Sequence, residues 1–88
     1  MYRITNVTDR AGNVKQESIA QLKEDHPDLV GEIIYKENCE IYKDRLRFEW
    51  ADDSNRMLLT STVLDYAEDE DKVVVTTMNS IYTFESVK

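Results

Sequence analysis

Residues that often perform catalysis or bind metals are scarce in this chain. It contains one histidine, His26, one cysteine, Cys39, and two glycines among its 88 residues. A structural zinc site needs four cysteine or histidine ligands at short spacings, which these two residues cannot supply. The serines lie in no nucleophile-elbow motif, and the two glycines stand too far apart to form a phosphate-binding loop. We therefore expect a protein that is not an enzyme and needs neither a metal nor a cofactor.

A row of basic residues is one candidate for a binding surface. If strand geometry extends backward from Arg47, the side chains of Lys43, Arg45 and Arg47 project from one face. This row could bind an acidic partner, or a nucleic-acid backbone with Tyr42 or Tyr35 stacking on a base. Pairing of the arginines with nearby carboxylates is the simpler interpretation, and we favour it.

Acidic residues outnumber basic residues, and the formal net charge is −7. Nucleic-acid binding draws its affinity from lysines and arginines that neutralise phosphates, so this charge disfavours nucleic acid as a partner. Two predicted loops, Asp52–Asn55 and Ala67–Asp71, are rich in carboxylates. If both lie at one end of the molecule, they could imitate a phosphate backbone and occupy the site of a DNA-binding protein. An acidic inhibitor that mimics DNA is therefore a further alternative.

The strand pattern is clearest over Arg45–Ala51. Charged and apolar residues alternate there, which predicts a half-buried strand with an inner face of Leu46, Phe48 and Trp50. A hairpin loop leads to a returning strand over 56–63, whose inner face is expected to carry Met57, Leu59 and Val63.

A second hairpin is predicted at the C-terminal end of the chain. The segments 73–75 and 81–84 are apolar on both faces, as strands covered on both sides are. Asn79–Ser80 is expected to form the tight turn between them, with Asn79 at positive φ. Across the two hairpins, the predicted core comprises Leu46, Phe48, Trp50, Leu59, Val75 and Phe84.

The N-terminal half predicts a strand, a short helix and another strand. The strand covers Tyr2–Val7, and a helix over Ile19–Asp25 is expected to be capped by Ser18 and stopped by Pro27. Ile19 and Leu22 form the inner face of this helix. A strand over 29–36 follows, in which Gly31 marks a bend or a close approach of the backbone. Residues 38–43 fit either a loop or a short edge strand.

These elements predict a mainly β fold of the α+β type for residues 1–88, forming a single domain. We expect a small SH3-like antiparallel β-barrel, or a highly bent sheet, of five or six strands with one short helix near the N-terminus. Closure into a barrel is favoured because it removes exposed strand edges. An open antiparallel sheet with the helix on one face is the alternative.

The C-terminal pattern also carries a resemblance. Thr60-Ser61-Thr62-Val63, followed by Val75-Thr76-Thr77-Met78-Asn79-Ser80-Ile81-Tyr82, resembles small uncharacterised proteins of Gram-positive bacteria, including ones carried by phages and other mobile elements. The shared motif is a strand, a turn and a strand without chemistry. The resemblance therefore implies a bacterial accessory protein and no particular activity.

The function that these observations favour is a small non-catalytic binding module that acts through protein–protein contacts. A single cysteine, the lack of a recognisable signal peptide and the lack of a long apolar run favour a cytoplasmic protein without a membrane span. The apolar faces of the second hairpin predict a homodimer through an exposed patch that includes Val74 or Tyr82.

Overall fold

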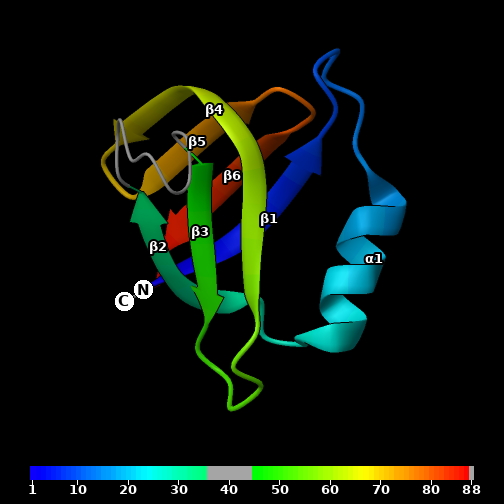
Figure 1. Cartoon of the computed structure of the whole chain (residues 1–88), viewed down its shortest axis with the longest axis vertical. Coiled ribbons are helices and arrows are strands. Elements are labelled where there is room, and N and C mark those ends of the chain that lie inside the picture. The colour runs from blue at the N-terminus through cyan, green and yellow to red at the C-terminus, as the bar shows by residue number, and fades with distance from the viewer. Residues whose placement is uncertain (36–44, 88) are drawn as a thin grey trace.

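The computed structural model describes residues 1–35 and 45–87. Within these residues, six antiparallel strands form a closed ring in which consecutive strands pair and the last strand returns to the first. This closed ring confirms a mainly β fold, with six strands in the described part of the chain, and overturns the open-sheet alternative. In chain order the elements are β1 Tyr2–Thr8, α1 Gln16–Asp25, β2 Val30–Tyr35, β3 Arg45–Trp50, β4 Met57–Asp69, β5 Lys72–Thr77 and β6 Ile81–Ser86 (Figure 1).

The core lies inside the ring and is centred on β3. Leu46, Phe48 and Trp50 are buried, as their alternation predicted. The ring of Phe48 lies 5.2 Å from that of Phe84 and meets Trp50 edge-on at 5.0 Å, both measured between ring centroids. Val75 and Phe84 are also fully buried. Five of the six predicted core residues are therefore confirmed.

The sixth residue, Leu59, lies on the outside of the ring with 41% of its surface exposed. Its position follows from an additional residue in β4. Arg47 pairs with Leu59, but Arg45 pairs with Thr62, so two steps along β3 correspond to three along β4. This β-bulge reverses the alternation of β4 at that point.

The inner face of β4 consequently differs from the one predicted from alternation. Leu58 packs against the core before the bulge, Thr60 is buried within the bulge, and Val63 is buried after it. Placing Met57 and Leu59 inside was therefore wrong, because a regular period of two cannot accommodate the inserted residue.

The helix α1 begins earlier than predicted, and Ser18 does not cap it. The N-cap residue is Lys15, which forms no capping bond through its side chain. Val14 forms a β-bridge to Thr8, and the amide of Lys15 donates to the carbonyl of Val7 at 2.8 Å. These contacts fix the chain next to β1, so the helix starts directly after them and Ser18 lies within its first turn.

Other features of the helix and of β2 agree with the sequence. Ile19 and Leu22 pack against the core, and α1 ends at Asp25, before Pro27. At Gly31, the Cβ atom of any larger residue would lie 2.1 Å from the carbonyl oxygen of Glu49 on β3. The close approach of the backbone expected there is confirmed.

The two turns that follow β4 differ from their predicted form. Ala67–Asp69 belongs to β4, so only Glu70 and Asp71 form the β4–β5 turn, with Glu70 at a φ of 49°. Met78 and Asn79 form the β5–β6 turn, where the amide of Ser80 donates to the hydroxyl of Thr77 at 3.0 Å. Asn79 is not at positive φ. The segment 38–43 lies outside the described residues.

Phe48→Ala should reduce the free energy of unfolding by about 3–5 kcal/mol, because it removes buried apolar contacts and leaves a cavity. Urea denaturation measures this loss. Leu59→Ala is the matched control on the outer face, and it should change stability by no more than about 0.5 kcal/mol. The opposite ranking of the two variants would show that the inner and outer faces of this hairpin are exchanged.

Ser18→Ala should change the free energy of unfolding by less than about 0.5 kcal/mol, since Ser18 is a helix residue without a capping role. If Ser18 were a helix cap, its replacement by alanine would instead reduce the free energy of unfolding by about 0.5–2 kcal/mol. Ser18→Gly is the control and should destabilise by about 0.5–1 kcal/mol because glycine is a poor helix former. A loss above about 1 kcal/mol for Ser18→Ala in thermal or urea unfolding would contradict this assignment.

Candidate functional site

The predicted basic row is only partly visible in the structure. Arg45 is exposed on β3, whereas Lys43 and Tyr42 lie outside the described residues. The Nε atom of Arg47 lies 3.3 Å from the Oε1 atom of Glu49, two residues further along the same strand. The expected pairing of an arginine with a carboxylate is therefore confirmed for Arg47, although it runs along β3 and not across strands.

Val74 and Tyr82 lie on opposite faces of the C-terminal hairpin. Tyr82 pairs with Val75, which is fully buried, and packs against the core. Val74 pairs with Thr83 and with Ala67, so it points to the outside of the ring. The structure therefore does not join Val74 and Tyr82 in one surface patch.

The two acidic loops are separated by the whole length of β4. The β3–β4 loop precedes Met57 and the β4–β5 turn follows Asp69, and Figure 1 shows them at different ends of the molecule. The convergence of negative charge that a DNA mimic would use is not formed by these loops.

His26 is buried at the end of α1, with 5% of its surface exposed. Its ring stacks on Trp50 with the ring centroids 4.0 Å apart and the planes 9° from parallel. Its Nδ1 atom bonds to a carboxylate oxygen of Asp52, and the other oxygen of Asp52 accepts from the hydroxyl and amide of Ser54. The bonds from Ser54, and then that from His26, lower the pKa of Asp52 to about 2.

This cluster has the composition of a catalytic triad but not its connectivity. In a triad the histidine lies between the serine and the aspartate, and removes the proton from the serine. Here Asp52 lies in the middle and Ser54 donates to the carboxylate. The cluster therefore joins the end of α1 to the β3–β4 loop, and this role could not be predicted from the separation of His26 and Asp52 in sequence.

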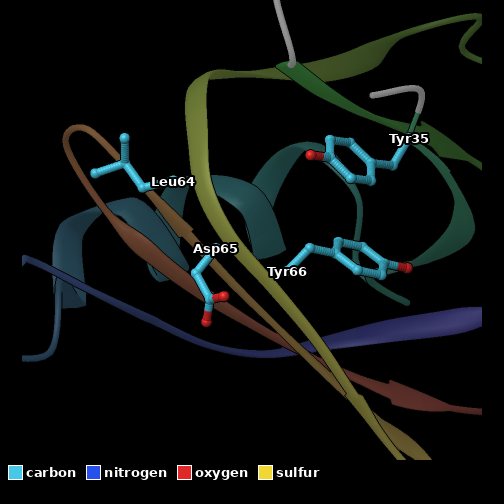
Figure 2. Close-up of a pocket in the computed structure, with 4 residues that line it drawn as sticks. All are labelled: Tyr35, Leu64, Asp65 and Tyr66. Carbon is cyan, nitrogen blue, oxygen red and sulfur yellow. The ribbon is translucent and has the colours of Figure 1, made fainter. Parts of the chain in front are cut away.

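A pocket of about 460 Å³ is lined by Tyr35, Leu64, Asp65 and Tyr66 (Figure 2). The rings of Tyr35 and Tyr66 stack with centroids 4.8 Å apart. Burial and a hydrogen bond to Glu68 raise the pKa of Tyr66. One face of Tyr35 is thus occupied by Tyr66, which leaves less of this ring for stacking on a base.

A groove of about 490 Å³ lies between α1 and the first part of β4. Its apolar lining comes from four different elements, namely Val7, Leu22, Leu58 and Tyr82. Lys15 and Ser80 also line it, and their side chains are joined by a 2.7 Å hydrogen bond. The groove was not predicted, because regular alternation puts Leu58 on the outer face of β4.

Within residues 1–35 and 45–87, no group of three or more histidine, cysteine, aspartate or glutamate residues is arranged to hold a metal ion. In the same part of the chain, no helix has the length and apolar character needed to cross a membrane.

Comparison of the chain with protein-family models, with curated proteins and with solved structures finds no match. The resemblance of the C-terminal hairpin to small Gram-positive proteins stays a prediction.

Asp52→Asn should destabilise the protein at neutral pH and have less effect in acid. Because the folded-state pKa of Asp52 is about 2, below the ordinary value of 3.8, its ionised form stabilises the fold above about pH 4. That stabilisation is lost as the pH falls through about 2. The difference in unfolding free energy between wild type and Asp52→Asn, measured in urea, should therefore narrow from about pH 5 to about pH 2. A pH-independent difference would contradict this role for the carboxylate.

Proposed function

We propose that this chain is a non-catalytic cytoplasmic binding module that acts through protein–protein contacts. The observation that carries the proposal is the outer face of the β3–β4 hairpin, where Met57 is 54% and Leu59 is 41% exposed. Large apolar side chains that point to solvent from a regular strand, and not from a loop, are typical of an interaction surface when they occur together.

Charged residues of β3 lie beside these two side chains. Leu59 lies opposite Arg47, and Met57 lies opposite Glu49. On the far side of β3, Arg47 pairs with the partly buried Ile34. Methionine and arginine are enriched in protein interfaces, so this mixed composition favours a protein partner.

The closed ring also supports an SH3-like barrel as the finer description of the fold. Consecutive strands pair, the last strand returns to the first, and β4 pairs first with β3 and then with β5 along its length.

The binding partner is either another protein or a second copy of this chain. No observation favours the nucleic-acid alternative in the same way, because Arg47 is paired with Glu49.

Met57→Ser combined with Leu59→Ser should weaken partner binding by about tenfold or more, the effect of losing one interface hot spot. Wild type and the double variant are immobilised, and proteins are captured on each from an extract of the native cells. The affinity of both forms for the captured protein is then measured with purified components. Met78→Ser is the matched control, because Met78 is equally exposed but lies on the β5–β6 turn.

Sedimentation of the same proteins at micromolar concentration tests the homodimer. If the partner is a second copy, wild type should sediment as a dimer and the double variant as a monomer. A wild-type protein that is monomeric, and that binds no protein more tightly than the double variant does, would refute the proposed function.

A further inference from the structure

The first part of β4 has one edge that no other described strand covers. β3 pairs with β4 at Met57, Leu58 and Leu59, but β5 pairs with β4 only from Val63 onward. Figure 1 shows this part of β4 between β3 and α1. We refer to the side of Met57–Leu59 that faces away from β3 as the β4 edge.

The hydrogen bonds of β3 show which backbone groups lie on the β4 edge. The amide of Trp50 donates to the carbonyl of Arg56, whereas the amide of Ala51 donates to Val30 on the β2 side. Because bonding alternates along an antiparallel pair, Leu58 bonds to Phe48 on β3. The N–H and C=O groups of Met57 and Leu59 therefore point away from β3, toward the β4 edge.

The β4 edge lacks the usual features that prevent strand pairing. Natural edge strands carry charged residues, prolines or bulges that block the approach of another strand. Met57, Leu58 and Leu59 are uncharged, none of them is proline, and the bulge begins after Leu59. The edge thus presents two donors and two acceptors in regular strand geometry.

The groove between α1 and β4 lies next to the β4 edge and can receive side chains. A strand added at the edge would direct alternate side chains to the inner face of the sheet, beside Leu58. There they would meet the apolar lining formed by Val7, Leu22 and Tyr82. The volume of about 490 Å³ is within the range of natural ligand sites.

Lys15 gives one end of the groove a positive charge. Its ammonium group donates to the hydroxyl of Ser80 at 2.7 Å and to the carbonyl of Asn79 at 3.3 Å. An ammonium group has three donors, so one remains for a bound anion. Glu17 also lines the groove, so a preference for a carboxylate is confined to the end formed by Lys15 and Ser80.

We propose that the β4 edge and the adjacent groove bind an extended peptide segment of a partner protein by strand addition. The segment is apolar at alternate positions, uncharged at its centre, and carries a carboxylate at the end that meets Lys15. This inference rests on the proposed function and specifies how the partner is held. A second folded copy fits less well, because α1 and the β5–β6 turn flank the groove and a whole domain would have to enter between them.

The experiment selects peptides from a displayed library of random heptapeptides against the immobilised protein. The enriched peptide is then synthesised and studied by amide hydrogen exchange. At a peptide concentration about 100 times the Kd, exchange of the Leu59 amide should slow by about 100-fold. The amide of Leu58, already bonded to β3, should change much less. Lys15→Gln should weaken binding by up to about fivefold, and Glu17→Gln should strengthen it.

Two variants of Leu59 distinguish the contribution of its backbone N–H to peptide binding from that of its side chain. Leu59→Pro removes the outward N–H without breaking a bond to β3, so it should abolish peptide binding. Leu59→Ser also removes the outer apolar side chain but keeps the N–H, so it should bind the peptide more tightly than Leu59→Pro does. No enrichment of peptides, or binding that leaves exchange at Met57 and Leu59 unchanged, would overturn strand addition. Partner capture that depends on the Met57 and Leu59 side chains would still support the proposed function in that case.

Discussion

The structure depends on β4 pairing with two different strands, one after the other along its length. Its first part pairs with β3 and its second part with β5, and a bulge lies on either side of this single change of partner. A bulge bends a strand and increases its twist, which allows one long strand to turn around the core. The uncovered edge at Met57–Leu59 is a direct result, because β5 joins β4 only beyond it.

The contacts of His26 with Trp50 and Asp52 hold α1, which forms one wall of the groove, in its place. They hold the end of α1 against the beginning of the β3–β4 loop, close to where β4 starts. The 4.0 Å ion pair between Asp25 and Arg56 joins the same two regions. At its other end, α1 is fixed by the bond from Lys15 to Val7. The helix is therefore attached at both ends, while the groove remains between it and β4.

Local patterns in the sequence predict the elements better than they predict the contacts between them. The alternation in β3 identified its buried face because no bulge interrupts Leu46–Trp50. Gly31 was recognisable because a missing side chain in a strand signals a close neighbour. The outward position of Leu59 depends on an insertion relative to β3, and the start of α1 depends on a bridge to Thr8. Both depend on contacts between separate segments of the chain, and the period and composition of a single segment do not reveal such contacts.

The same limit applies to the candidate site. Val7, Leu22, Leu58 and Tyr82 are separated in sequence and come together only when the ring closes. The stacking of His26 on Trp50 likewise joins residues from separate elements, so a lone histidine gave no sign of its partners. Of the residues singled out in advance, Tyr82 lines the groove, whereas Arg45, Arg47 and Val74 do not.

The pairing of β1 with β6 affects how the chain reaches its native state. This ladder joins Tyr2 to Ser86, whereas the other ladders join strands that follow one another in the chain. Bringing together segments so distant in sequence has the largest cost in chain entropy, and this cost slows folding. Because neither β1 nor β6 is left as a terminal strand of an open sheet, the ring has no outer strand that can detach without breaking two ladders. Closure of the ring thus makes the two ends of the described chain part of one cooperative folding unit.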